Sequence, residues 1–167
     1  MIWCNRSITR FIVVGAVLMG LSPLSSAPNT AQDSDSIEAA VSGFLVAFNN
    51  LDMPKFITCF TEDATIFHPP AAPPRTFPTR LQGRREIERS FQMAFDEIRQ
   101  RSGRATAPYM NLQPEDLLIQ RFDGSAVVTF HLGTETVRGR RTLVLRRVGS
   151  DWKIVHLHAS TFNGDQK

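Results

Sequence analysis

Two histidines near the end of the chain, His156 and His158, have the residue type and spacing best suited to chemistry. They follow a Gly149-Ser150-Asp151 break, in a run rich in β-branched residues that predicts the second strand of a β-hairpin. Because side chains alternate between the two faces of a strand, both imidazoles are expected on one face, with Trp152, Ile154 and Ser160. An imidazole on such a face can be a general acid or base, a ligand anchor or a metal ligand.

The preceding strand is expected to bring an arginine to the same region. If the hairpin turns on Gly149-Ser150, Arg141 lies opposite His158, where its guanidinium offers a bidentate fork to a carboxylate or enolate. A turn that is one residue longer puts Thr142 in that position instead, so both registers stay open. The predicted ligand has an apolar body and an acidic or enolate-like group. Its candidate binding residues are His156, His158, His131, Arg141, Trp152, Phe67 and His68.

The same residues allow three other interpretations. In a catalytic site, His158 is the best candidate for the general acid or base. In a metal site, His156 and His158 would need His68 or His131 as a third ligand, but no carboxylate stands at ligand spacing, and we predict no metal. The histidines are also compatible with a purely structural role, held by hydrogen bonds to the backbone or to Ser160.

Residues 1–27 have the order of a secretory signal peptide. Arg6 and Arg10 precede an apolar run at 11–21, and the small residues Ser25-Ser26-Ala27 follow. The run is too short to cross the ~30 Å core of a bilayer, which needs roughly 20 helical residues. We expect cleavage after Ala27, a secreted or periplasmic protein, and no membrane attachment afterwards.

Cleavage changes the charge and the cysteine content. The signal peptide takes two of the 19 basic residues and none of the 16 acidic ones, so the net charge falls from +3 to +1. The clustered basic face that nucleic-acid binding needs is not indicated. Cys59 stands alone once Cys4 is removed, which excludes an intramolecular disulfide. The 140 residues that remain of 167 predict one domain stabilised by its core.

The first half of the mature chain has mainly helical periodicity. Residues 28–35 are polar and are expected to form a disordered leader. The spacing of apolar residues then predicts helices over 36–49, 54–59 and 83–104. A brief strand is expected at 64–68, and the five prolines within 69–82 indicate a long surface loop.

The second half has twofold periodicity. Leu117–Phe122 and Ser125–Leu132 flank Asp123-Gly124, a strong hairpin signal, and the terminal hairpin follows. One face of the first hairpin is apolar, with Leu117, Ile119, Ala126, Val128, Phe130 and Leu132. Three helices before a four-stranded meander predict an α+β fold, with the helices on one face of a curved antiparallel sheet and the 64–68 strand at an edge.

This order of elements resembles the nuclear transport factor 2-like superfamily, in particular its SnoaL-like branch, over residues 36–162, with 163–167 as a tail. The run Trp152-Lys153-Ile154-Val155-His156-Leu157-His158 after Arg146-Arg147 is also similar to the end of the association domain of calcium/calmodulin-dependent protein kinase II. The resemblance implies a cone-shaped fold with three N-terminal helices on the concave face, a pocket between the layers, and dimerisation through the sheet. It does not imply one activity, because this fold hosts isomerases, cyclases, dehydratases and assembly domains.

We therefore expect an exported protein that binds a small molecule. The alternatives are an acid–base isomerase, dehydratase or cyclase that uses a pocket histidine, and an oligomeric assembly domain without catalysis. Relatives of the ketosteroid isomerase type use a carboxylate base, whereas the acids of the strand region here, Asp116, Asp123, Glu135 and Asp151, lie at turns, and Tyr109 is the one tyrosine. We expect a homodimer, no cofactor and no nucleic-acid partner.

Overall fold

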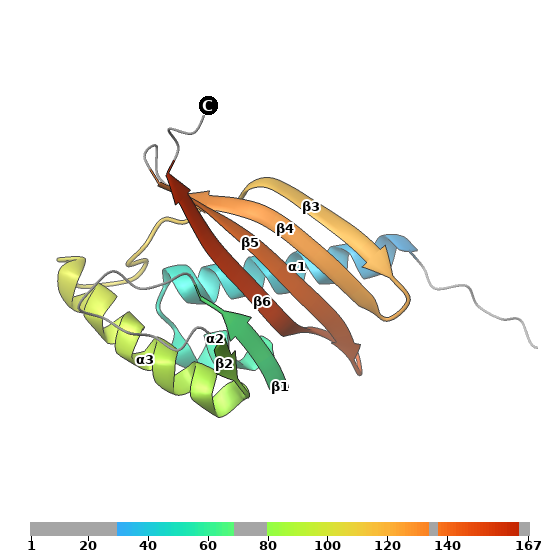
Figure 1. Cartoon of the computed structure of the whole chain (residues 1–167), viewed down its shortest axis with the longest axis horizontal. Coiled ribbons are helices and arrows are strands. Elements are labelled where there is room, and N and C mark those ends of the chain that lie inside the picture. The colour runs from blue at the N-terminus through green and yellow to red at the C-terminus, as the bar shows by residue number, and fades with distance from the viewer. Residues whose placement is uncertain (1–29, 69–79, 134–136, 164–167) are drawn as a thin grey trace, which may run out of the picture.

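The computed structural model describes residues 30–68, 80–133 and 137–163 of the chain (Figure 1). The predicted signal peptide, residues 28–29 of the leader, most of the proline-rich segment (69–79) and residues 164–167 of the tail lie outside the described residues. Within the described ranges, no helix is both long enough and apolar enough to span a membrane.

The three predicted helices are present. They are α1 (Thr30–Asn49), α2 (Met53–Thr58) and α3 (Arg84–Arg101). Helix α1 begins at Thr30 and not at Ser36, so residues 30–35 of the expected leader are helical; the segment holds no proline or glycine that would stop a helix. Helix α2 begins as its sequence indicates, because Asp52 accepts a hydrogen bond from Lys55 N at 3.2 Å and Pro54 occupies an early position.

The strands form one six-stranded, open and curved sheet in the order β2-β1-β6-β5-β4-β3 (Figure 1). Their bounds are β1 (Phe60–Phe67), β2 (Arg80–Gln82), β3 (Glu115–Phe122), β4 (Ser125–Gly133), β5 (Val137–Val148) and β6 (Asp151–Asn163). The predicted α+β fold with a curved antiparallel sheet is confirmed, except that one pair of strands is parallel, β1 with β6. Strand β2 was missed: it lies at the end of the expected loop and pairs with β1.

The predicted β3–β4 hairpin is confirmed. Phe122 pairs with Ser125 across a two-residue Asp123-Gly124 turn, in which Gly124 has the positive φ (66°) that favours glycine. Strand β4 alternates between buried and half-buried residues, and its buried set is the predicted apolar face: Ala126, Val128, Phe130 and Leu132. This face looks toward the helices and is called the helix-facing side of the sheet; the opposite one is called the outer face.

The core lies between the helices and the helix-facing side. Phe56 of α2 and Phe95 of α3 are fully buried, and their ring centroids are 5.2 Å apart. Phe44 and Phe48 of α1 join them, as do Phe60 and Phe91. The helical aromatic residues thus hold α1, α2 and α3 against one another and against β1.

One extra residue in β6 changes which side chains face the helices. Leu145 pairs with Ile154 and Val144 pairs with His156, so Val155 has no partner on β5 and forms a β-bulge. Before the bulge Trp152 and Ile154 are buried; after it Leu157 and Ala159 are the buried residues. The prediction that His156 and His158 share a face with Trp152 is therefore wrong, because a bulge of one residue exchanges the two faces of a strand.

Asn49 joins the end of α1 to the segment that leads into β3. Its side chain accepts a hydrogen bond from Leu112 N at 2.8 Å and donates one to Leu112 O at 3.1 Å. Its backbone carbonyl accepts from Tyr109 N at 2.9 Å and from Met110 N at 3.1 Å. A single residue thus satisfies several backbone groups of a segment that has no regular secondary structure.

We predict that Asn49→Ala destabilises the fold by about 1–3 kcal/mol, because it leaves the amide and carbonyl groups of Leu112 without their partner. Urea unfolding followed by circular dichroism measures the loss. Asn50→Ala is the matched control, since the Asn50 side chain makes no hydrogen bond among the described residues. Equal stability of the two variants would contradict the assignment.

Candidate functional site

The structure divides the predicted ligand-binding residues into three groups. His156, His158, His131 and Phe67 lie on the outer face, and Arg141 and His68 lie on the helix-facing side. Trp152 is also buried on the helix-facing side but lies at the start of β6, away from Arg141 and His68. The terminal hairpin does turn on Gly149-Ser150, because Val148 pairs with Asp151. The bulge at Val155 nevertheless places Thr142, and not Arg141, opposite His158.

The outer-face histidines form a small aromatic cluster with β1. Thr65 Oγ1 lies 2.7 Å from His156 Nδ1, and the Phe67 ring contacts His156 and His158 at centroid distances of 5.4 Å and 6.1 Å. The Arg80 guanidinium lies 4.9 Å from the centre of the Phe67 ring. Burial lowers the pKa of His156, and electrostatic repulsion from the neighbouring His158 and Arg80 lowers it further.

His131 is also on the outer face but lies two strands away from His156 and His158. It lies on β4 opposite Arg140, and its Nδ1 is 3.4 Å from a carboxylate oxygen of Asp116. The alternative metal clamp would need a third histidine beside His156 and His158, but His131 lies two strands from His158 and His68 faces the opposite side. Across the described ranges, no three His, Cys, Asp or Glu side chains gather as metal ligands.

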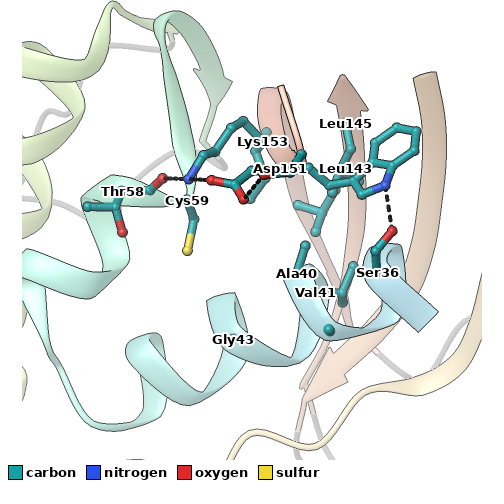
Figure 2. Close-up of a pocket in the computed structure, with 14 residues that line it drawn as sticks. Ser36, Ala40, Val41, Gly43, Thr58, Cys59, Leu143, Leu145, Asp151 and Lys153 are labelled. Atoms are coloured by element: carbon teal, nitrogen blue, oxygen red, sulfur yellow. Dashed lines mark hydrogen bonds and ion pairs between the residues drawn. The ribbon is translucent and has the colours of Figure 1, made fainter. Parts of the chain in front are cut away.

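Trp152 lines a hollow of about 370 Å³ between α1, the end of α2 and the β5–β6 hairpin (Figure 2). Its indole Nε1 donates to Ser36 Oγ at 2.8 Å, and Lys153 Nζ donates to Thr58 O at 3.0 Å. Cys59 opens onto the same hollow, and burial raises the pKa of its thiol, so the thiolate is disfavoured. These polar contacts tie α1 and α2 to the hairpin, which gives Trp152 a structural role.

Arg141 carries its charge on the helix-facing side of the sheet. It lies on β5 between Phe130 of β4 and Ala159 of β6, both of which are buried. Its Nη1 donates to the carbonyl oxygens of Arg140 at 2.9 Å and Ser160 at 3.2 Å. Burial lowers the pKa of the guanidinium, which means that the site removes water from a cation.

His68 stands across β6 from Arg141. Phe67 pairs with His158, so His68 is level with Ala159, the partner of Arg141. Its ring lies 5.2 Å from that of Phe91 on α3, which places it on the helix-facing side. Burial lowers the pKa of His68, and the positive charge of Arg141 lowers it further, so its imidazole is neutral at pH 7.

These residues form the candidate site, which we call the Arg141–His68 corner. A cation and a neutral imidazole flank the small side chain of Ala159, and the aromatic rings of Phe91 and Phe130 border them. In the part of the chain that the structure describes, no carboxylate forms an ion pair with Arg141. The arrangement can bind an anionic group and can hold or remove a proton beside it.

Sequence reasoning selected both residues of this corner but grouped them with the wrong neighbours. It also missed Gly139, which lies two residues before Arg141 on the same face of β5. The Gly-x-Arg spacing within a strand was the available signal, since a glycine inside a strand often marks a close approach by another group.

The family model for the SnoaL-like domain matches residues 37–163 of this chain. No curated protein matches the chain significantly. Residues 37–163 span the helices from α1 onward and the whole sheet, so the match covers the candidate site as well as the core.

Solved structures share the fold. A proposed dehydratase of the NTF2-like family from Streptomyces avermitilis superposes with a TM-score of 0.63 and 18% identity, covering 80% of this chain and 98% of the other. A proposed ketosteroid isomerase from Parabacteroides distasonis gives 0.56 and 20%, with coverages of 75% and 86%.

The predicted likeness to a kinase association domain also has a structural counterpart. A proposed association domain of the calcium/calmodulin-dependent protein kinase type II from Thiobacillus denitrificans gives a TM-score of 0.55 at 25% identity, covering 75% of this chain and 94% of the other. Together with the family model and the α+β architecture, these likenesses show that the chain belongs to the SnoaL-like family of NTF2-like proteins.

Proposed function

We propose that this protein binds a small organic acid, or an enolate-forming compound, with an apolar body at the Arg141–His68 corner. The observation that carries the proposal is the state of Arg141: its charge is partly desolvated and lacks a carboxylate partner among the described residues. A buried charge is costly unless it is paired, and an anionic ligand would supply the pair.

The donors of Arg141 favour the same conclusion. Both of its hydrogen bonds within the described residues come from Nη1, so Nε and Nη2 keep their N–H groups for a further acceptor. Two such donors in one plane match the two oxygens of a carboxylate. The buried rings of Phe130 and Phe91 make the border of the corner apolar, which suits a ligand with an apolar body.

A second candidate function is acid–base catalysis at the same corner, and the neutral state of His68 favours it. A neutral imidazole can take a proton from the carbon next to a ligand carbonyl, and the positive charge of Arg141 would stabilise the enolate that forms. Return of the proton to another carbon completes an isomerisation. The base would be His68, and not His158 as the sequence suggested, because His158 lies on the outer face.

We further propose that two copies associate through the outer face of the sheet. Its centre carries β-branched residues that no described helix covers: Val127 and Thr129 on β4, Thr142 and Val144 on β5. The five longer strands, all except β2, lie about 4.8 Å apart and are roughly nine residues long, so the face measures about 24 by 31 Å. Its area is close to the ~800 Å² per partner that a stable dimer buries.

Export is the remaining part of the proposal. It is supported by the order of basic, apolar and small residues in the first 27 positions, and by Cys59 being the one cysteine after them. The protein would then meet its ligand outside the cytoplasm.

We predict that Arg141→Gln weakens binding of 2-naphthoate roughly 10- to 100-fold, because charge-assisted hydrogen bonds contribute about 1.5–3 kcal/mol. The matched control is Arg140→Gln, which removes the neighbouring, exposed arginine on the outer face. Calorimetric titration measures both. Equal affinities of the two variants would exclude Arg141 as the anion-binding group.

For the second candidate, we predict that the protein catalyses exchange of deuterium from D₂O into the carbon next to the carbonyl of a 3-keto steroid, and that His68→Gln abolishes exchange. Only the neutral imidazole accepts a proton, so exchange falls as pH drops through the pKa of His68. Since that pKa lies below its usual value, exchange persists at pH 6.5. Proton NMR follows the reaction; exchange by the His68→Gln variant at the original rate would contradict this role.

For the outer face, we predict that Val144→Glu converts a dimer into a monomer, because a two-fold contact brings the new carboxylates close together in a partly dehydrated interface. Light scattering at matched concentration measures the mass. Val46→Glu on the exposed side of α1 is the control and should leave the dimer intact. A monomeric wild type would refute self-association altogether.

A further inference from the structure

Gly139 and Arg141 are in direct contact on the helix-facing side of β5. A Cβ atom placed on Gly139 would lie 2.9 Å from Arg141 Nη2 and 3.0 Å from Cζ, and closer still to Nη1. A real Cβ atom almost never lies this close to an atom of another residue. The Arg141 guanidinium therefore occupies the space that a side chain at position 139 would need. The φ angle of Gly139 is not positive, so the backbone itself would accept alanine.

The contact explains how the guanidinium reaches its hydrogen-bond acceptors. Residues 139 and 141 share a face of β5, and a side chain on a strand leans along the strand. Because the Arg141 side chain lies back over Gly139, its Nη1 reaches the carbonyl oxygens of Arg140 and Ser160. These two residues are opposite each other on β5 and β6. A Cβ atom at position 139 would force the guanidinium to shift from this position.

We propose that Gly139 is the positioning residue of the anion-binding site: it holds the Arg141 guanidinium flat on the sheet so that Nε and Nη2 present a fixed fork to a monocarboxylate ligand. The inference rests on the proposed function and adds a residue and a ligand geometry to it. Gly139 itself touches no ligand. Its effect is on selectivity for the acid over an uncharged isostere, because it sets the direction of the fork and not the size of the apolar surface.

The test compares 2-naphthoate with 2-naphthamide, which has the same rings and no charge. We expect wild type to prefer the acid by about tenfold or more. In Gly139→Ala the preference falls toward one while affinity for the amide stays unchanged, since the charge remains but the fork is displaced. Gly43→Ala is the matched control, because a Cβ on Gly43 meets nothing within 4 Å; it should retain the wild-type preference.

A double-variant cycle separates a positional effect from a general one. If Gly139 acts through Arg141, adding Gly139→Ala to Arg141→Gln changes neither affinity further. If Gly139→Ala folds poorly, the same four proteins can be compared by thermal unfolding. The shorter glutamine leaves room for the new Cβ, so the double variant should be as stable as Arg141→Gln.

The outcomes distinguish the inference from the proposed function. A wild-type preference that Arg141→Gln removes and Gly139→Ala leaves intact overturns the role of Gly139 and keeps Arg141 as the anion-binding residue. The role of Gly139 is also overturned if Gly139→Ala weakens ligand binding equally in wild type and in Arg141→Gln. A wild type without any preference for the acid overturns both the binding site and the positioning role.

Discussion

The extra residue in β6 is the constraint on which the distribution of polar groups depends. With Val155 unpaired, the strand carries Trp152 and Ile154 toward the helices at its start and Leu157 and Ala159 toward them later. Without the bulge, continued alternation would direct His156 and His158 into the apolar core. The bulge moves these imidazoles to the outer face and leaves the small Ala159 between Arg141 and His68. One residue thus determines which titratable groups share a site.

Local patterns in the sequence were sufficient for most of the architecture. The spacing of Phe44, Phe48, Phe91 and Phe95 indicates helices whose aromatic faces meet, and Asp123-Gly124 with alternating neighbours indicates the first hairpin and its buried face. These signals are local, because periodicity and turn chemistry involve residues that are close in the chain. The SnoaL-like resemblance rested on the same order of elements, and the family match agrees with it.

The features that the sequence did not predict involve contacts between distant residues, a very short strand, or the insertion of one residue in a strand. The parallel pairing of β1 with β6 joins residues about 90 positions apart, for which no local pattern exists. Strand β2 is only Arg80–Gln82, too short to show alternation. The bulge is hidden because Val155 fits either face of a strand. As a result, the predicted site contained Arg141 and His68, which the fold brings together, but also three histidines that the fold places elsewhere.

The environment of Arg141 indicates function more directly than the fold does. A stable sheet gains nothing from a partly desolvated guanidinium, and leucine at this position would pack between Phe130 and Ala159 at lower cost. The surroundings of Arg141 nevertheless accommodate it in detail: Gly139 clears space for the guanidinium, and two backbone carbonyls orient it. In the binding role proposed for Arg141, such an arrangement would cost stability in the free protein and recover it when an anion binds. We therefore interpret the corner as preorganised for binding, since a fixed fork loses less conformational entropy when it closes on a carboxylate than a free arginine would.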